Sequence, residues 1–238
     1  MKKSVLIKLS GEIMGGCMPL VDHGTDHCSH LNSIAEQIKR LQTSHVVGIV
    51  IGGGNIFRAS REGKALGLRQ QSADQAGMLA TVINGIVLRD KLESAGVAVT
   101  LLSAFAVPSV AQPVQDSTIR TALDKDHCII FVGGTGNPFF TTDTCAVLRA
   151  LQINATAVWK ATKVDYIYDA DPEKTASCSP LKDISYQTVI DKKLGIMDST
   201  AITLAQQHRM PIRVFNAFTP NALVNAAHDT SIGSTIHI

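Results

Sequence analysis

The chain has 238 residues, of which 45% are hydrophobic and 18% charged, and this suits one large α/β domain or two tightly joined lobes. Its formal net charge of +2 is too small to indicate a nucleic-acid or membrane partner. No apolar run approaches the ~18 residues of a membrane span, and five cysteines without a CxxC pair indicate reduced thiols and a cytoplasmic location.

Short runs rich in valine and isoleucine alternate with segments in which apolar residues recur at spacings of three and four. The first pattern is typical of buried parallel strands, and the second predicts amphipathic helices. In chain order we expect a strand at 4–9, a helix at 31–41, a strand at 46–51, a helix at 72–94, strands at 97–102 and 128–132, a helix at 142–153, a strand at 155–161, helices at 186–194 and 199–208, a strand at 212–215 and a helix at 220–227. Ser185 and Asp198 are expected N-caps, and Thr219 is expected to cap a helix that has Pro220 at its first position.

The alternation of strands and helices predicts the fold class. It indicates an α/β fold with a mainly parallel sheet sandwiched by helices. We expect a single domain over residues 1–238, with an N-terminal acceptor lobe at about 1–150 and a C-terminal nucleotide lobe at about 151–238. The polar stretch 166–180, which lies near this boundary, is expected to form a hairpin or a loop.

Three glycine-rich turns follow three of the expected strands. They are Lys-Leu-Ser-Gly at 8–11, Gly-Gly-Gly-Asn at 52–55 and Gly-Gly-Thr-Gly-Asn at 133–137. Ligands bind beyond the carboxyl ends of the strands in an open parallel sheet, and glycine lets the backbone approach a phosphate closely. One such turn alone can simply close a tight connection. Three of them together predict a phosphate-binding site.

Basic residues near these turns are candidates for meeting phosphate charge. The chain has neither the G-x-x-x-x-G-K-[ST] nor the G-x-G-x-x-G motif, which disfavours P-loop kinases and dinucleotide dehydrogenases. Lys8 and Lys160 each lie at the end of an apolar strand, so we expect them to point into a ligand crevice rather than into solvent. For Arg58 and Lys163, a phosphate contact and a solvated surface position remain equally open.

Two aspartates complete the candidate chemistry. Asp74 and Asp143 lie near the starts of expected helices, where a purely capping role is the alternative. Phosphoryl transfer needs Mg²⁺, which is usually held by few carboxylates together with phosphate oxygens and water. We therefore expect Mg²⁺ to arrive with ATP, and we predict no protein metal site for it.

Several motifs resemble one family along nearly the whole chain. They occupy residues 8–12, 50–58, 77–85, 133–143, 160–165 and 211–216. The most specific is Gly-Thr-Gly-Asn-Pro-Phe-Phe-Thr-Thr-Asp at 134–143. The chain thereby resembles the bacterial uridylate kinases of the amino-acid-kinase family. The resemblance implies the amino-acid-kinase fold and transfer of the γ-phosphoryl group of ATP to UMP in de novo pyrimidine synthesis. It also implies a homohexamer, a cytoplasmic location and feedback inhibition by UTP.

The resemblance implies three sets of site residues. The ATP contacts are Lys8, Leu9, Ser10, Gly11, Gly54, Arg58, Thr162, Tyr168 and Asp171. The UMP contacts are Gly53, Asp74, Thr135, Gly136, Asn137, Pro138, Phe139, Phe140, Thr141 and Thr142, with Asp74 on the ribose hydroxyls. The residues close to the transferring phosphoryl group are Lys8, Asp143 and Lys160.

Two segments depart from the family pattern. The usual Gly-Asp-His before the long helix is Ala73-Asp74-Gln75 here, and the aspartate is retained. The usual glycine-rich segment linked to GTP activation is replaced at 14–27, so a response to GTP is not expected. The loop that replaces it is rich in histidine and cysteine: Cys17, His23, His27, Cys28 and His30. We interpret it as a polar surface loop, with a transition-metal site as the alternative, because no CxxC anchors such a site.

Other functions remain open for this fold. One is an enzyme that phosphorylates a carboxylate or a carbamate. Another is a non-enzymatic protein that binds nucleotide or oxyanions, and a third is a uridylate-sensing regulator. Retention of Lys8, Asp143 and Lys160 argues against a protein that only binds.

Overall fold

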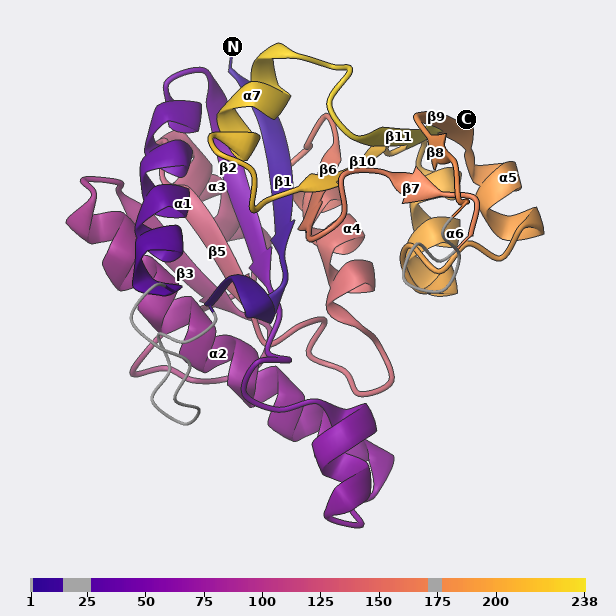
Figure 1. Cartoon of the computed structure of the whole chain (residues 1–238). Helices are drawn as coiled ribbons and strands as arrows, with labels where there is room; N and C mark the ends of the chain where they lie inside the picture. Colours follow the sequence, from indigo (N-terminus) through magenta and orange to yellow (C-terminus); the bar gives the residue numbers. More distant parts are fainter. Residues whose placement is uncertain (1, 15–26, 171–176) are drawn as a thin grey trace.

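A single open sheet organises the molecule (Figure 1). The computed structural model describes residues 2–14, 27–170 and 177–238. The nine strands of the sheet have the order β4-β3-β5-β2-β1-β6-β10-β11-β9. Their bounds are β1 Lys3–Leu9, β2 His45–Ile51, β3 Val99–Ser103, β4 Gln112–Pro113, β5 Cys128–Val132, β6 Val158–Thr162, β9 Asp183–Ser185, β10 Ile212–Asn216 and β11 Ser234–His237. Every pair of neighbours is parallel except β10 and β11, which are antiparallel.

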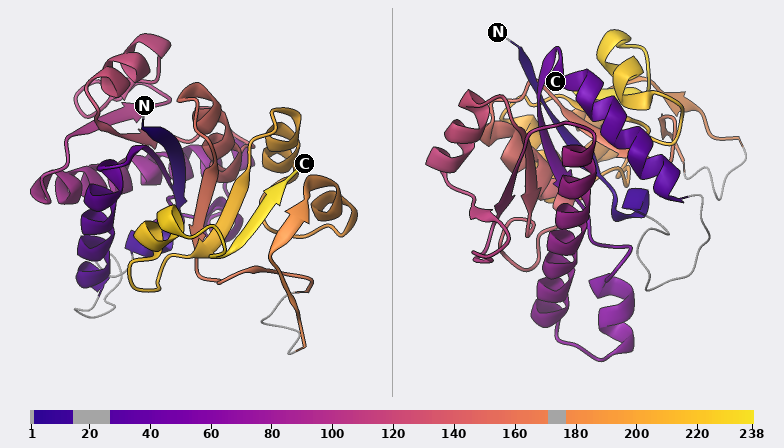
Figure 2. Two further views of the ribbon diagram at one scale, coloured as in Figure 1. Left: turned by 90° about the horizontal axis from the view of Figure 1, so that it is seen from above. Right: turned by 90° about the vertical axis from the view of Figure 1, so that its left-hand side faces the viewer.

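Helices cover both faces of this sheet (Figure 2). The bounds are α1 His27–Gln42, α2 Gln70–Ser94, α3 Asp116–Asp124, α4 Thr142–Gln152, α5 Tyr186–Asp191, α6 Ser199–Gln207 and α7 Ala222–His228. A 3₁₀ turn, η1, spans Gly11–Met14, and a π turn, η2, spans Ala59–Gly63. Buried side chains of α1, α2 and α7 form one core cluster with the sheet, and those of α3 to α6 form the other. The predicted sandwich of helices around a mainly parallel sheet is confirmed.

The apolar sequence of the central strands explains their position. All five residues of β5 are buried, and in β1 Leu6 packs in one core cluster while Ile7 packs in the other. Successive side chains of a strand point to opposite faces, so a strand covered on both sides must be apolar at every position. Within the part of the chain that the structure describes, no helix is long and apolar enough to span a membrane.

The helix starts test the predicted caps. Ser185 accepts a hydrogen bond from the Thr188 amide, and Asp198 accepts one from the Ala201 amide, so both caps are confirmed. The prediction for Thr219 and Pro220 is wrong, because α7 begins at Ala222 after Asn221. The Thr219 hydroxyl instead donates to the Asn216 carbonyl at 3.0 Å and closes a turn.

The polar stretch after β6 contains a hairpin. Strands β7 (Ile167–Tyr168) and β8 (Pro180–Leu181) pair antiparallel as a separate two-stranded sheet. Of the hairpin or loop expected at 166–180, the described residues show a hairpin. Among the described elements, the strands β4, β9 and β11, the helix α3 and the short turns η1 and η2 were not predicted.

Candidate active site

The glycine turns lie side by side because their strands are neighbours in the sheet. The turns follow β1, β2 and β5, and these strands have the order β5-β2-β1. The Gly52 amide donates to the Leu9 carbonyl at 2.9 Å, which joins the first two turns. A Cβ at Gly11 would lie 2.4 Å from Asn55 Oδ1, so only glycine fits this contact. Gly133 has a φ of 77°, a left-handed conformation that also favours glycine.

A Lys–Asp–Lys cluster lies at the carboxyl ends of β1 and β6. Lys8 and Lys160 are register partners on these adjacent parallel strands. Lys8 Nζ lies 3.0 Å from Asp143 Oδ1, and Lys160 Nζ lies 2.8 Å from Asp143 Oδ2. Lys160 also donates to the Ile196 carbonyl. The three side chains are only 12–14% exposed. One anion between two cations leaves the cluster with net positive charge for a phosphoryl group.

The environment shifts the pKa of Asp143 in a definite direction. Burial on its own raises this pKa, but the charges of Lys8 and Lys160 and their hydrogen bonds outweigh burial, so the pKa is lower than usual. Burial, with a smaller contribution from Lys8, lowers the pKa of Lys160, and Asp143 opposes that change.

Asp143 is the second residue of α4, and Thr141 caps this helix by accepting from the Asp143 amide at 3.0 Å. A capping role for Asp143 is therefore not what the structure shows.

A cavity of about 490 Å³ opens beside the second and third glycine turns. Among the residues predicted to contact UMP, its lining includes Gly53, Asp74, Phe140, Thr141 and Thr142. The other predicted contacts, residues 135–139, form the adjoining loop and do not line the cavity.

Asp74 connects α2 to this loop. Its Oδ2 accepts from the Phe139 amide at 2.9 Å, and its Oδ1 accepts from Gln70 Nε2 at 2.8 Å. Phe139 has a φ of 71°, which is rare for a residue other than glycine, and its side chain is 74% exposed. Residues in sparsely populated conformations are concentrated at ligand sites, so the loop has the character of a binding segment.

A second cavity, of about 630 Å³, lies on the other side of the cluster. Of the residues predicted to contact ATP, Thr162 and Tyr168 line it, whereas Gly54 and Arg58 line the first cavity. Lys160, predicted to lie close to the transferring phosphoryl group, lines it as well. Asp171, another predicted ATP contact, lies outside the described residues. Lys160 is the residue that joins the ion-pair cluster to this second cavity.

The predicted residues of the first turn, at 8–11, line neither of these two cavities. Leu9 is fully buried, and its carbonyl already accepts from the Gly52 amide. The buried Ser10 hydroxyl has no hydrogen-bond partner within residues 2–14, 27–170 and 177–238. A buried polar atom in this condition marks a place where a ligand or water completes the bonding.

Buried polar side chains that the sequence analysis missed hold the turns in place. Asn84 of α2 is fully buried and donates to the Gly52 carbonyl and to Asn55 Oδ1, both at 2.7 Å. Thr81, one helical turn earlier, accepts from the Gly133 amide at 2.7 Å. Both residues lie in the motif at 77–85, and each is a polar residue within an expected helix, which is the signal that could have identified them.

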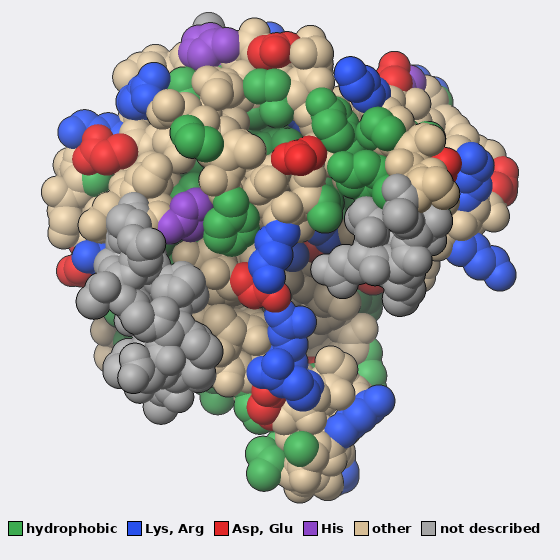
Figure 3. All heavy atoms as spheres, viewed as in Figure 1, with side chains coloured by type: hydrophobic (Ala, Val, Ile, Leu, Met, Phe, Trp, Pro, Cys, Tyr) green, Lys and Arg blue, Asp and Glu red, His purple; other side chains and the backbone are tan. Residues whose placement is uncertain are grey.

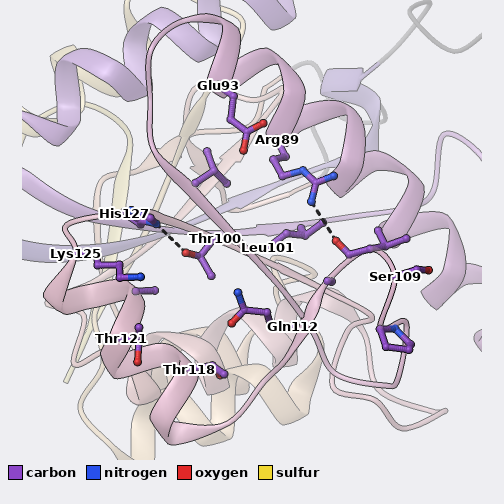
Figure 4. Close-up of a pocket in the computed structure, with 15 residues that line it drawn as sticks. Arg89, Glu93, Thr100, Leu101, Ser109, Gln112, Thr118, Thr121, Lys125 and His127 are labelled. Carbon is purple, nitrogen blue, oxygen red and sulfur yellow. Dashed lines mark hydrogen bonds between the residues drawn. The ribbon is translucent and has the colours of Figure 1, made fainter.

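A third cavity, of about 340 Å³, shares no lining residue with the other two. Figure 4 shows that Arg89 and Glu93 approach it from α2, and Thr118, Thr121 and Lys125 from α3 and the residue after it. Arg89 donates to the Val110 carbonyl at 3.0 Å. None of these residues belongs to the predicted site.

No metal cluster is visible in the described ranges. There, no group of three or more His, Cys, Asp or Glu side chains could hold a metal ion. The alternative of a transition-metal loop depends on residues 17–28, whose side chains lie outside the described part of the structure. It therefore stays a hypothesis. His30, at the end of this segment, stacks on Phe218 with 4.6 Å between the ring centroids.

The site combines glycine-rich turns, of the kind that bind phosphate, with a buried cationic cluster between two cavities. At the edge of an open parallel sheet, this combination is typical of α/β proteins that transfer phosphoryl groups. Residues 3–216 match the amino acid kinase family, and the chain belongs to this family. A uridylate kinase of Haemophilus influenzae (strain PittEE) is 45% identical over 235 residues, which cover 98% of this chain and 97% of that protein. The crystal structure of a UMP kinase from Ureaplasma parvum has a TM-score of 0.91 and 32% identity over 100% of both chains. That of a UMP kinase from Bacillus anthracis has a TM-score of 0.91 and 32% identity, covering 99% of this chain and 96% of that one.

Proposed function

We propose that this protein transfers the γ-phosphoryl group of ATP to UMP and releases UDP and ADP. The observation that carries the proposal is the buried cluster of Lys8, Asp143 and Lys160 between two cavities. The extent of the similarity to uridylate kinases, 98% of the chain, favours UMP over a carboxylate or carbamate as the acceptor.

The mechanism is positioning together with neutralisation of charge. Negative charge spreads over the equatorial oxygens of the transferring group in the transition state, and little covalent chemistry is required. Lys8 and Lys160, held by Asp143, stabilise that charge together with the backbone N–H groups of the glycine turns. The phosphate of UMP attacks as a dianion, so no strong general base is needed. Asp143 orients the two lysines rather than removing a proton.

The two cavities support the proposed division of the chain. The cavity of about 490 Å³ is lined entirely by residues before 150, and we assign it to UMP. The cavity of about 630 Å³ is lined entirely by residues after 150, and we assign it to ATP. Gly54 and Arg58 would reach the ATP phosphates from the UMP side, because they lie in the wall of the first cavity.

A divalent metal acts with ATP in this chemistry, and we propose Mg²⁺. Such a metal neutralises phosphate charge when it is bound with the nucleotide. The residues present fit a metal held mainly by phosphate oxygens, because both oxygens of Asp143 face lysines and the described side chains form no carboxylate cluster.

The assembly, the regulation and the location remain proposals. We infer a homohexamer in the cytoplasm that is inhibited by UTP, as the resemblance implies. Leu79 and Ile83 are 51% and 42% exposed on α2, which supports contact between subunits because such apolar positions favour burial. Sedimentation of the purified protein as a monomer would contradict the assembly.

A coupled assay for ADP release tests the proposed function. ATP and Mg²⁺ are supplied with each of UMP, CMP, AMP and aspartate in turn. We expect rapid ADP release with UMP and little with the other acceptors. Release with aspartate would indicate a carboxylate kinase of the same fold, and tight nucleotide binding without ADP release would indicate a protein that only binds or senses nucleotide.

A further inference from the structure

Glu12 joins two cations that belong to different strands. It lies in η1, directly after β1. Its Oε1 is 2.7 Å from Arg58 Nη2, and its Oε2 is 2.9 Å from Lys163 Nζ. Arg58 follows β2 and Lys163 follows β6, which are the two strands on either side of β1. One carboxylate therefore spans three neighbouring strand ends.

The two cations lie at the edges of the two nucleotide cavities. Arg58 lines the cavity assigned to UMP, and both chain neighbours of Lys163, Thr162 and Val164, line the cavity assigned to ATP. Figure 3 shows acidic and basic side chains interspersed along a stripe near the middle of the face of the molecule that is drawn there. Glu12 therefore lies where the triphosphate of an ATP bound in one cavity would extend toward the other cavity.

The contacts of the two cations differ in number. Arg58 is fixed by a second bond, since its Nε donates to the Gly54 carbonyl at 3.0 Å. For Lys163, which is 61% exposed, Glu12 is the one partner found in the described part of the chain. An exposed lysine has a flexible stem with many rotamers, so a single carboxylate decides where its charge is placed.

Glu12 is suited to this role because it stays charged. The hydrogen bond from Lys163 lowers its pKa most, burial opposes this, and the charges of Lys163 and Arg58 add to the lowering. Lys163 and Arg58 are the charged groups that face it. The ionised form is therefore held at neutral pH, and the pairing is lost only as the pH falls through the lowered pKa.

We propose that Glu12 is a positioning residue for ATP, whose carboxylate holds Arg58 and Lys163 in place between the two cavities to receive the triphosphate. This inference rests on the proposed function. Two cations that are already oriented bind a polyanion without first losing side-chain freedom. Glu12 itself does not touch the reacting atoms, because it acts through its two partners.

The variant Glu12→Gln gives the direct test. An amide keeps the shape and one acceptor for Arg58, but it offers no charge to Lys163. We expect KM for ATP to rise roughly threefold to tenfold, while kcat and KM for UMP stay within about twofold. We also expect the acid limb of kcat/KM for ATP to flatten, since the titrating carboxylate is gone.

A matched control removes an ion pair elsewhere. Asp116→Asn breaks the exposed pair between Asp116 and Arg120 on α3, at 2.5 Å, with the same change of charge. This variant should leave KM for ATP unchanged. An equal rise of KM in both variants would mean that net charge, not positioning, is responsible, and would overturn the inference.

A double variant separates positioning from a general structural effect. If Glu12 acts through Lys163, then Glu12→Gln should add little to the effect of Lys163→Met, because the two changes remove the same interaction. Full additivity, or a wild-type KM for ATP in Glu12→Gln, would contradict the inference. The dissociation constant of ATP, measured by calorimetry, gives the same comparison without turnover. The absence of turnover in the wild-type protein would therefore contradict the proposed function and leave the test of Glu12 intact.

Discussion

Lys8 and Lys160 differ from ordinary surface lysines in what surrounds them. Both are nearly buried, and both contact the same carboxylate, Asp143. Their place at the ends of apolar strands was predictable, because a charge in such a sequence has to face a crevice. Their shared partner was not predictable from the residues, because it depends on the first turn of α4 being packed against β1 and β6.

Removing either lysine should slow the chemical step. We expect Lys8→Met or Lys160→Met to lower kcat roughly 10²–10³-fold, the scale of losing one preorganised donor to the transition state. Steady-state kinetics with saturating ATP and UMP measure this effect, and thermal unfolding of each variant shows whether it still folds. A kcat within a few-fold of the wild-type value would remove that lysine from the mechanism.

Asp74 is proposed to bind the ribose of UMP. Asp74→Asn should raise KM for UMP, because the amide accepts hydroxyl hydrogen bonds less strongly than a carboxylate. KM for ATP should change little, since Asp74 lines the cavity that we assign to UMP and not the one that we assign to ATP. A rise of KM for ATP alone would show that the two cavities are assigned the wrong way round.

The lowered pKa of Asp143 has a consequence for stability. A carboxyl whose pKa is lower in the folded state stabilises the protein above its unfolded pKa of about 3.9, and this contribution is lost as the pH falls through the folded value. Asp143→Asn should therefore be less stable than the wild type near neutral pH, and the difference should shrink in acid. Thermal unfolding of both proteins across this pH range measures it, and a constant difference would contradict the ion-pair account.

At the scale of elements, long apolar strands were predictable and short paired ones were not. Strand β5 is apolar along its length and β1 is apolar from Val5 to Ile7, so their sequence alone indicates burial on both faces. Strand β9 has three residues and β11 four, and their main-chain pairing rather than their composition makes them strands. The cap predicted at Thr219 failed because the Asn216 carbonyl captures its hydroxyl.

Helix α2 supports the glycine turns through Asn84. Asn84→Ala should lower the free energy of unfolding by about 1–3 kcal/mol, because it leaves the Gly52 carbonyl and Asn55 without a buried partner. Denaturant unfolding measures this. The control Asn225→Ala removes an amide from an exposed position, where its bond to Pro220 is 3.4 Å long, and should cost less than about 0.5 kcal/mol. Equal losses would mean that Asn84 has no special supporting role.

At the scale of the whole molecule, the strand order creates the site. The three glycine turns are far apart in the sequence, and the order β5-β2-β1 makes them neighbours. Fold class followed from the alternation of strands and helices, but strand order does not follow from composition or periodicity. The sequence therefore pointed to the residues of the site, and only the structure shows which of them share a cavity.

Transfer of labelled phosphate tests the central claim most directly. The protein is incubated with UMP, Mg²⁺ and ATP that carries the label in its γ-phosphate, and the products are separated. We predict that the label appears in UDP, one equivalent for each ADP formed, and that Lys160→Met loses nearly all of this transfer. Label that stays in ATP or is released only as inorganic phosphate, while the protein still binds both nucleotides, would contradict the account.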